Sequence, residues 1–547
     1  MRVIILFIAC FSLFNTSCKA QLPQGKKAFS RQDTLRGNVT PERAWWDAVK
    51  YDISITPDFA QKAIRGINIL SFKALKPGKR MQIDMQVPMK ITDIIYQRQS
   101  LPLTREGNVY YADFPQPLPQ EEILSLQIHF EGAPRIAVNP PWDGGWIWAK
   151  DKEGNPWVSA ACQGLGASSW YPCKDHQGDE PDSAVITLIV PDTLIGISNG
   201  RLRDKQKQPA GLTAYTWAVT NPINNYAIVP YIGKYAHWSE QYEGEKGKLD
   251  LDYWALEEDL DKARRQFKQV PEMLKCFEYW FGPYPFYEDG YKLVQAPYLG
   301  MEHQSAIAYG NEFKNGYLGR DLSGSGWGLK WDYIIVHESG HEWFGNNITT
   351  NDIADMWVHE GFTHYSEALF TECQSGKAAG NEYSIGTRKL ISNDRPVIGA
   401  YGLNNRGSDD MYYKGGALVH MIRQLINDDE KFRALLRGLN SDFHYQTVDS
   451  RRIEDYISKK TGIDLSPFFD QYLRTVNIPT LEYQYSDRTL QYRWSNCVEG
   501  FNMPLRIFSG GKPLWIYPTE KWKKTETEGD SFEADRNFYI QVKKINR

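Results

Sequence analysis

The chain has 547 residues, a net charge of −4, and a balance of 41% apolar and 24% charged residues. This length predicts several domains, and the apolar fraction excludes a largely disordered chain. The small net charge gives no support to nucleic-acid binding, which normally requires a basic excess, so we expect no nucleic-acid partner.

The first twenty residues resemble an export signal. Arg2 supplies a positive start, residues 3–14 form an apolar run, and the small Ala20 precedes the expected cleavage point. The run is too short to span a bilayer comfortably, and no later segment has eighteen uninterrupted apolar residues. We therefore expect that the mature chain has no transmembrane segment and is either periplasmic or secreted. A lipid anchor on Cys18 is a second interpretation, ranked lower because Asn15 is a poor residue three places before a lipid-modified cysteine.

Cysteine usage excludes a disulfide framework. The cysteines that remain after signal cleavage are Cys162, Cys173, Cys276, Cys373 and Cys497. This odd number leaves at least one thiol unpaired, and no C-x-x-C pair is present. Any metal must therefore be held by histidines and carboxylates.

Residues 45–242 favour strands over helices. Apolar and polar residues alternate at 51–55, and stretches at 91–96 and 123–130 are rich in β-branched or apolar residues. Residues 185–190, closed by a proline, indicate a more deeply buried strand. We expect an all-β domain here.

The pattern changes near Leu249. Residues 256–280 carry apolar residues at helical spacing, and Pro271 marks a kink or a first turn. After Pro479 the alternation typical of strands returns, at residues 481–485 among others, and predicts a small β-sandwich. Between these segments, further helices are predicted at residues 331–344, 356–370, 417–426 and 453–460.

These patterns predict a multidomain α+β chain. A signal peptide precedes an N-terminal β domain, a mostly helical domain and a C-terminal β-sandwich. The predicted bounds are residues 1–20, 21–248, 249–478 and 479–547.

A metal-binding motif lies in the helical middle. His337, Glu338 and His341 fit H-E-x-x-H, and residues four apart on a helix share one face, so both imidazoles can converge on one Zn²⁺. Glu338 lies beside them, where it can take a proton from a metal-activated water. Glu360, on the next predicted helix after eighteen intervening residues, supplies a third ligand. Three protein ligands leave a position for water, which is typical of a catalytic site with one zinc per chain.

The motif alone is weak evidence, because a polar helix face can carry the same residues. Apolar residues at 333–336 and 343–344 flank it and predict a buried helix, in which histidines and a carboxylate need partners. Glu367 lies two turns beyond Glu360, and we expect it to accept a hydrogen bond from a zinc-bound imidazole. A solvated helix carboxylate is an equal alternative for Glu367.

The zinc motif, followed by Trp343-Phe344-Gly345 and then by W-x-x-E-G-F at residues 357–362, resembles the aminopeptidase N family of gluzincin zinc metallopeptidases. The resemblance covers nearly all of the mature chain. It implies an N-terminal β saddle, a thermolysin-like catalytic domain and a short β-sandwich, without the helical C-terminal domain of many relatives. The other matching stretches are residues 281–285, 300–303 and 412–415, and Gln163 nine residues before Pro172.

The resemblance also implies roles for individual residues. Glu302, assisted by Gln163, recognises a free ammonium group, and Gly300 and Met301 contact the substrate. Tyr412 donates a hydrogen bond to the oxyanion. The implied function is a zinc-dependent aminopeptidase that hydrolyses the N-terminal peptide bond of peptides through a metal-activated water. Without the resemblance, Glu302 would be interpreted as a solvated loop carboxylate and Tyr412 as a half-buried aromatic before a helix.

The chain departs from the family pattern at two positions. Leu299 stands where the motif usually begins with glycine, and His303 replaces an asparagine, which puts specificity in doubt and predicts pH-sensitive binding. Gly407 stands where a leukotriene-processing relative carries an additional tyrosine, so epoxide hydrolysis is not expected.

Two other functions compete with this interpretation. A metalloendopeptidase with the same zinc machinery would cut N-acetylated peptides as readily as free ones. A non-catalytic peptide-binding protein would have lost a ligand or the general base, and neither is missing here.

Overall fold

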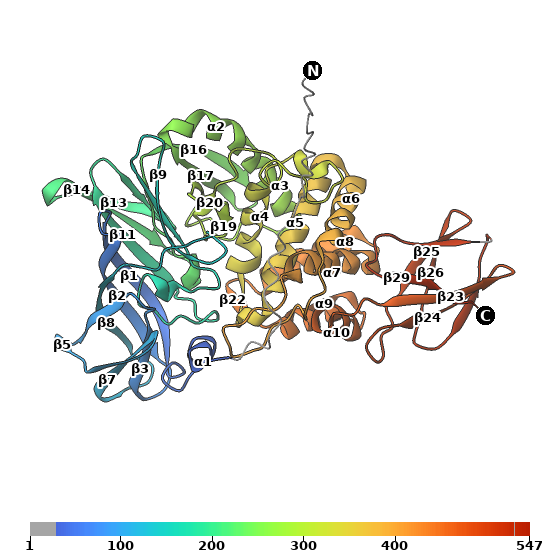
Figure 1. The fold of residues 1–547 in the computed structure, drawn as a ribbon, viewed down its shortest axis with the longest axis horizontal. Coiled ribbons are helices and arrows are strands. Elements are labelled where there is room, and N and C mark those ends of the chain that lie inside the picture. Colours follow the sequence, from blue (N-terminus) through green and yellow to red (C-terminus); the bar gives the residue numbers. More distant parts are fainter. Residues whose placement is uncertain (1–28, 530, 547) are drawn as a thin grey trace, which may run out of the picture.

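The computed structural model describes residues 29–546 except residue 530. The predicted signal segment and Cys18 lie outside the described residues. Figure 1 shows a β-rich region, a helical region and a second β region following one another along the longest axis. The predicted multidomain α+β class is therefore confirmed. Among the described helices, none is long and apolar enough to cross a membrane.

An eight-stranded sheet forms the largest part of the N-terminal region. Strand β1 pairs in parallel with β11 and antiparallel with β2. The four predicted strands lie in β1, β4, β8 and β11, and β1 buries every second residue from Tyr51 to Pro57, as the alternation at 51–55 predicts. The order across the sheet is β13 (Arg201–Gln208), β14 (Leu212–Val219), β11 (Ser183–Pro191), β1 (Trp46–Asp58), β2 (Ala63–Ala74), β8 (Ile123–Gly132), β4 (Lys90–Tyr96) and β5 (Gln99–Ser100).

Two smaller sheets complete this region. Two loops of the four-stranded sheet reach the functional site described below. One carries Trp142, which precedes β9, and the other carries Gln163, which follows β10. Its order is β12 (Ile195–Ile197), β15 (Tyr231–Gly233), β10 (Pro156–Ala161) and β9 (Gly145–Lys150). The three-stranded sheet has the order β3 (Gly78–Asp84), β7 (Val109–Leu118) and β6 (Leu103–Glu106).

A five-stranded sheet opens the helical region. Its first two strands form a hairpin, and the predicted boundary at residue 248 falls inside that hairpin. Two of its pairs, β17 with β18 and β18 with β20, are parallel. The order is β16 (Tyr235–Gly244), β17 (Gly247–Leu256), β18 (Tyr291–Gln295), β20 (Ile307–Tyr309) and β19 (Gly300–Met301).

The helices begin and end partly outside the predicted ranges. The predicted helix at 256–280 is split into α2 (Leu260–Gln266) and α3 (Val270–Phe281), with Pro271 in the first turn of α3. Helix α7 (Asp410–Ile426) begins before residue 417, so Tyr412 lies in its first turn. The remaining helices are α1 (Arg31–Gly37), α4 (Tyr333–Gly340), α5 (Trp357–Ser375), α6 (Lys377–Thr387), α8 (Asp429–Asp442), α9 (Ser450–Thr461) and α10 (Ser466–Arg474).

Two small sheets form the C-terminal region. The pair β23–β24 contains the predicted strand at 481–485, and β23 begins close to the predicted boundary at residue 478. One sheet has the order β27 (Lys523–Glu526), β24 (Thr489–Ser495), β23 (Thr480–Ser486) and β29 (Gln541–Lys544). The other has the order β26 (Lys512–Ile516), β25 (Leu505–Ser509) and β28 (Phe532–Ala534). A short parallel pair within the helical region joins β21 (Ile348–Thr350) to β22 (Gln446–Val448).

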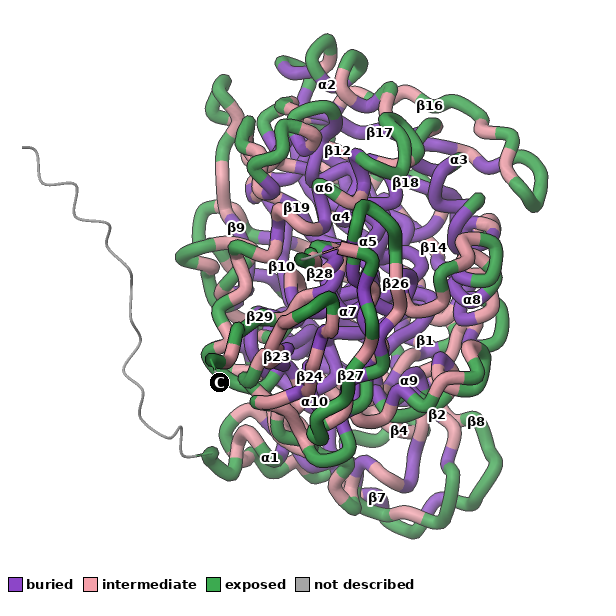
Figure 2. The backbone as a smooth tube through the Cα atoms, turned by 90° about the vertical axis from the view of Figure 1, so that its right-hand side faces the viewer, coloured by how far each residue is buried: buried purple, intermediate pink, exposed green. Residues whose placement is uncertain are grey.

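The hydrophobic cores join the regions rather than separating them. The core of the N-terminal sheets continues onto the five-stranded sheet through Val294, Tyr298 and Met301. The core of the helical region continues into the C-terminal sheets through Leu481 and Trp494. Figure 2 shows the resulting buried backbone through the middle of the molecule. Loops of the N-terminal region are therefore held firmly against the helical region.

One disulfide is present among the described cysteines. Cys276 on α3 is bonded to Cys373 on α5, a pairing that the sequence did not indicate. Cys162, Cys173 and Cys497 are free. The expectation that at least one thiol stays unpaired is met.

Candidate functional site

The histidine motif lies on a short, fully buried helix, α4. The Asp332 side chain begins this helix by accepting hydrogen bonds from the N–H groups of Ile334 and Ile335. The helix ends at Gly340, before the predicted residue 344, and in the short π-helical segment that follows the chain leaves the helical path at Phe344 (φ −126°, ψ 97°) and Gly345 (φ 130°). His337 lies in the last turn of α4, and His341 follows directly as its C-cap residue.

Glycines bring the neighbouring helices close to each other. A Cβ on Gly340 of α4 would meet the Ser366 hydroxyl of α5 at 2.7 Å, and a Cβ on Gly361 of α5 would meet the Cα of Gly415 on α7 at 3.0 Å. Any larger side chain at these positions would separate the three helices. The glycines thus set the spacing between the histidines, Glu360 and Tyr412.

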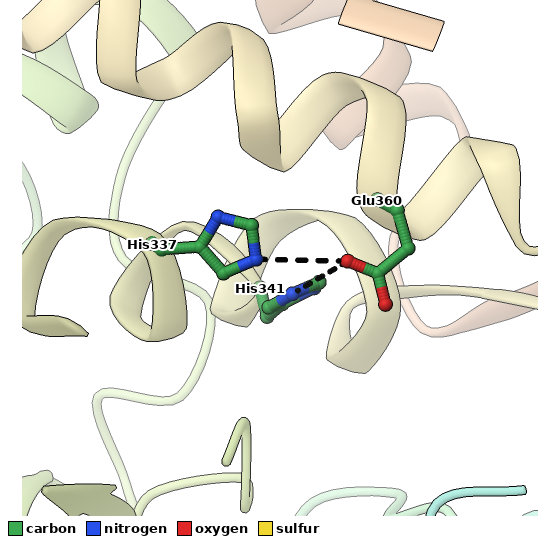
Figure 3. A group of neighbouring side chains, drawn as sticks. All are labelled: His337, His341 and Glu360. Atoms are coloured by element: carbon green, nitrogen blue, oxygen red, sulfur yellow. Dashed lines mark ion pairs between the residues drawn. The ribbon is translucent and has the colours of Figure 1, made fainter. Parts of the chain in front are cut away.

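His337, His341 and Glu360 converge on one point, as Figure 3 shows. The Glu360 Oε2 atom lies 3.6 Å from His337 Nε2 and 3.4 Å from His341 Nε2. All three residues are at least 96% buried. Burial would raise the pKa of Glu360, but the facing His341 and His337 lower it well below its usual value. Glu360 is therefore a carboxylate.

The far side of each imidazole is already occupied. His337 Nδ1 lies 2.7 Å from Glu367 Oε1, and His341 Nδ1 lies 3.0 Å from the Phe344 carbonyl oxygen. With Nδ1 directed to these acceptors, each Nε2 faces Glu360. Both rings are thus oriented to bind a metal through Nε2.

These residues fit a zinc ion. Glu360 Oε2 is buried without a hydrogen-bond partner, an unfavourable state unless a cation binds there. Two imidazole nitrogens and one carboxylate oxygen are a ligand set that catalytic zinc uses. The site would hold Zn²⁺ through His337, His341 and Glu360.

Glu367 is fully buried rather than solvated. Its Oε1 contacts His337 Nδ1 at 2.7 Å and His364 Nδ1 at 3.0 Å, and its Oε2 accepts from Tyr383 O–H at 2.6 Å. Burial would raise the pKa of Glu367, but His364 and His337 lower it to about 2. A permanent carboxylate therefore orients His337.

Glu338 lines the cleft beside the ligands. Burial raises the pKa of Glu338 to about 7, and His337 and His341 only partly offset this effect. A Cβ on Gly300 would lie 2.8 Å from Glu338 Oε1, so this glycine leaves the room that the carboxylate occupies. A carboxyl group with a pKa near neutrality is suited to accept and return a proton.

Tyr412 enters the same cleft from the first turn of α7. Its ring lies 6.1 Å from the His337 ring, centroid to centroid. Burial and the carboxylates of Glu360, Glu302 and Glu338 raise the pKa of Tyr412 well above its usual value. The phenol therefore keeps its proton and can donate a hydrogen bond.

Glu302 is buried beside the metal ligands, with a carboxylate oxygen within 4.8 Å of ligand atoms of His341 and Glu338. Its Oε1 accepts hydrogen bonds from the Gln163 amide and, at 3.2 Å, from Tyr226 O–H. Gln163 also donates to Glu360 Oε1 at 3.3 Å, and Asn346 donates to the Glu302 carbonyl at 3.0 Å. The predicted partners Glu302 and Gln163 are thus brought together, and Tyr226 joins them without a motif that would have identified it.

His303 does not face the cleft as a titrating group. Its Nδ1 lies 2.8 Å from Tyr231 O–H, and burial lowers its pKa to about 3. The histidine is neutral at physiological pH. The predicted pH-sensitive binding at His303 was wrong, because the sequence could not show that this side chain is enclosed.

One cavity of about 410 Å³ contains all the predicted site residues except Glu367. Gly300 and Met301 line it, as expected. It is also lined by residues that the sequence analysis did not identify. For several of them, aromatic or apolar character is the only signal that could have identified them. These additional residues are Pro141, Trp142, Tyr317, Leu322, Tyr333, Ile334, Arg406, Asp409 and Tyr413.

Comparison with known proteins gives a consistent result. Residues 265–472 match the family model for the peptidase family M1 domain. Human aminopeptidase B is 22% identical over 77% of this chain and 67% of its own length. Leukotriene A-4 hydrolase of Xenopus laevis is 24% identical over 70% of this chain, which spans 59% of that protein.

Solved structures share the fold. An M1 zinc metallopeptidase from Deinococcus radiodurans has a TM-score of 0.65 at 20% identity, covering 79% of this chain and 94% of its own. A mutant of the same protein, bound to a Tyr-Ser-Ala substrate, has a TM-score of 0.66 at 19% identity and covers 80% and 97%.

Proposed function

The chain belongs to peptidase family M1, in the aminopeptidase N type of zinc metallopeptidase, and we propose that it removes the N-terminal residue from peptides. The observation that supports this most directly is the buried Glu302 carboxylate, held by Gln163 and Tyr226 in the same cavity as the zinc ligands. Burial raises the pKa of Glu302, and an ion pair between this buried group and a free ammonium group would select substrates by that ammonium group. One zinc ion per chain is proposed, on His337, His341 and Glu360.

Glu338 is assigned the proton transfers. Bound zinc supplies Lewis acidity, which polarises the scissile carbonyl and lowers the pKa of water. Glu338 takes the proton from the attacking water and then delivers it to the leaving amine. Its pKa of about 7 favours both directions of transfer.

Tyr412 is assigned to the developing oxyanion. Its phenol remains protonated beside three acidic side chains, so it can donate a hydrogen bond to the oxyanion of the tetrahedral intermediate. Its place in the first turn of α7, held against α5 by Gly361 and Gly415, gives this donor a fixed position.

Epoxide hydrolysis is not part of the proposal, although leukotriene A-4 hydrolase is among the similar proteins. A Cβ on Gly407 would lie 1.8 Å from the Val397 carbonyl oxygen. The local backbone has no room for the tyrosine that would be needed there.

Export is also proposed, to the periplasm or the outside of the cell. The apolar segment at residues 3–14 and the Cys276–Cys373 disulfide support it, because disulfides persist in oxidising compartments. Release after Ala20 is favoured over a lipid anchor on Cys18. Mass spectrometry of the mature N-terminus tests both, since a free Gln21 supports cleavage and a lipidated Cys18 contradicts it.

The proposed function is tested with a panel of aminoacyl fluorogenic substrates and their N-acetylated counterparts, each with and without a chelator. We expect turnover of the free substrates only, its loss on chelation and its return with zinc. Equal turnover of acetylated substrates would indicate an endopeptidase, and a purified protein that neither contains nor binds zinc would refute the assignment. The matched variant is Glu302→Gln, which should raise KM for free substrates by roughly tenfold or more, since a buried ion pair is lost.

A further inference from the structure

Trp142 is exposed at the edge of the functional cavity. Its exposed fraction is 59%, whereas Trp146 and Trp170 in the same region are fully buried. Among the described residues it has no stacking partner, yet it lines the cavity together with Pro141. An unstacked indole beside a catalytic cleft offers a large apolar face that a substrate can cover.

The turn that carries Trp142 packs against the loop that carries Gln163. A Cβ on Gly144 would lie 2.6 Å from the Cβ of Leu165, and Leu165 N–H donates to the Gln163 carbonyl at 2.8 Å. Within the turn, Gly144 N–H donates to the Pro141 carbonyl at 3.1 Å. Since Gln163 holds Glu302, Trp142 lies at the end of the cleft where the ammonium group binds.

The turn is held in place by Asp143. Its carboxylate accepts from the N–H groups of Val138 and Asn139 at 2.8 and 2.9 Å and lies 3.6 Å from the Arg135 guanidinium. These contacts fix the backbone on both sides of the indole. Trp142 is therefore presented by an ordered turn.

Apolar side chains also line this cleft from the helical region. Leu299 and Met301 flank Gly300 at the start of the strand that leads to Glu302, and both line the cavity. Arg406 also lines it, but Asp409, 2.9 Å from it, lines the same cavity and offsets its charge.

We propose that Trp142 is a specificity-determining residue that covers the side chain of the substrate's first residue, with Leu299 on the other side, and so selects peptides beginning with a large apolar or aromatic residue. This inference rests on the proposed function. It assigns a selective role to a loop of the N-terminal β region, which supplies none of the zinc ligands.

The test compares kcat/KM for Phe-, Leu-, Ala-, Arg- and Glu-aminoacyl fluorogenic substrates on the zinc-loaded, full-length protein. The wild-type protein should prefer Phe and Leu. Trp142→Ala should lower the Phe-to-Ala ratio by about tenfold, because an apolar contact with the first side chain is lost. Trp142→Phe should retain most of the ratio, and Leu299→Ala should lower it in the same direction.

A matched control is Trp522→Ala, which removes an exposed tryptophan from the C-terminal sheets and should leave the ratio unchanged. Inhibition by free L-phenylalanine and by free L-alanine measures binding directly. Trp142→Ala should weaken the inhibition by L-phenylalanine and leave the inhibition by L-alanine unchanged. A wild-type preference for Arg or Glu, or an unaltered ratio in Trp142→Ala, overturns the inference. If no free substrate is cleaved, or acetylated ones are cleaved equally, the proposed function itself fails.

Discussion

The two ends of the cleft are built in different ways. The metal end, formed by His337, His341 and Glu360, comes from two consecutive helices in one short stretch of chain. The amine end, formed by Gln163, Tyr226 and Glu302, joins residues up to 139 positions apart from two regions of the molecule. The proposed chemistry is therefore local in sequence, whereas the proposed substrate selection depends on how the N-terminal β region is packed against the helices.

The sharpest test of the metal end is Glu338→Gln. The substitution keeps the shape of the side chain but removes the base, so kcat should fall by roughly 10³-fold while zinc binding is retained. Steady-state kinetics and metal analysis of the same preparation measure both quantities. Substantial activity in the zinc-loaded variant would contradict the assignment of Glu338.

This comparison also explains what the sequence could predict. Residues four apart in a helix share one face, so the convergence of His337 and His341 can be predicted from their spacing without knowledge of the tertiary structure. The strand alternation at 51–55 likewise appears in β1 because one face of the sheet packs on a core.

The rest depends on tertiary packing. Tyr226 lies in a short turn between strands, and only the docking of the two regions brings its hydroxyl to Glu302. The burial of His303 has the same origin, as does the Cys276–Cys373 pairing, since neither follows from a local pattern. Periodicity reveals which face of an element is buried but not which distant residue covers it.

Glu367→Gln tests whether the metal end depends on its buried support. The neutral amide can still accept from His337 Nδ1, but the charge that orients and strengthens this ligand is lost. Zinc affinity should fall by roughly 10- to 100-fold. Competition with a chromogenic chelator measures it, with the exposed Glu430→Gln as the control. Unchanged affinity would show that packing alone orients His337.

Tyr226→Phe tests the amine end. The variant removes only the hydroxyl that donates to Glu302 at 3.2 Å. KM for substrates with a free amine should rise by up to about tenfold, with a smaller effect on kcat, because the loss affects binding more than the chemical step. Tyr517→Phe, at an exposed tyrosine of the C-terminal region, is the control. An equal fall in kcat and no change in KM would place Tyr226 in the chemical step instead.

The smallest effect concerns Glu180, which supports the amine end across the boundary between the two regions. Burial raises its pKa to about 7, and the nearby Thr349 and Asn224 side chains oppose this only partly. Asn224 in turn accepts from Tyr226 N–H at 3.3 Å. Glu180 therefore lies near both Thr349 of the helical region and the turn that positions Tyr226.

The sign of its pH dependence follows from proton binding. An unfolded chain loses the Glu180 proton near its ordinary pKa of 4.5, whereas the folded protein keeps it until about pH 7. Between these values the folded state binds more protons, so the free energy of unfolding contributed by this group falls as pH rises. Glu180→Gln removes that contribution, and its Tm should decline less than that of the wild type between pH 5 and pH 7. The exposed Glu243→Gln serves as the control, and parallel Tm curves for Glu180→Gln and the wild type would show that Glu180 ionises normally in the folded protein.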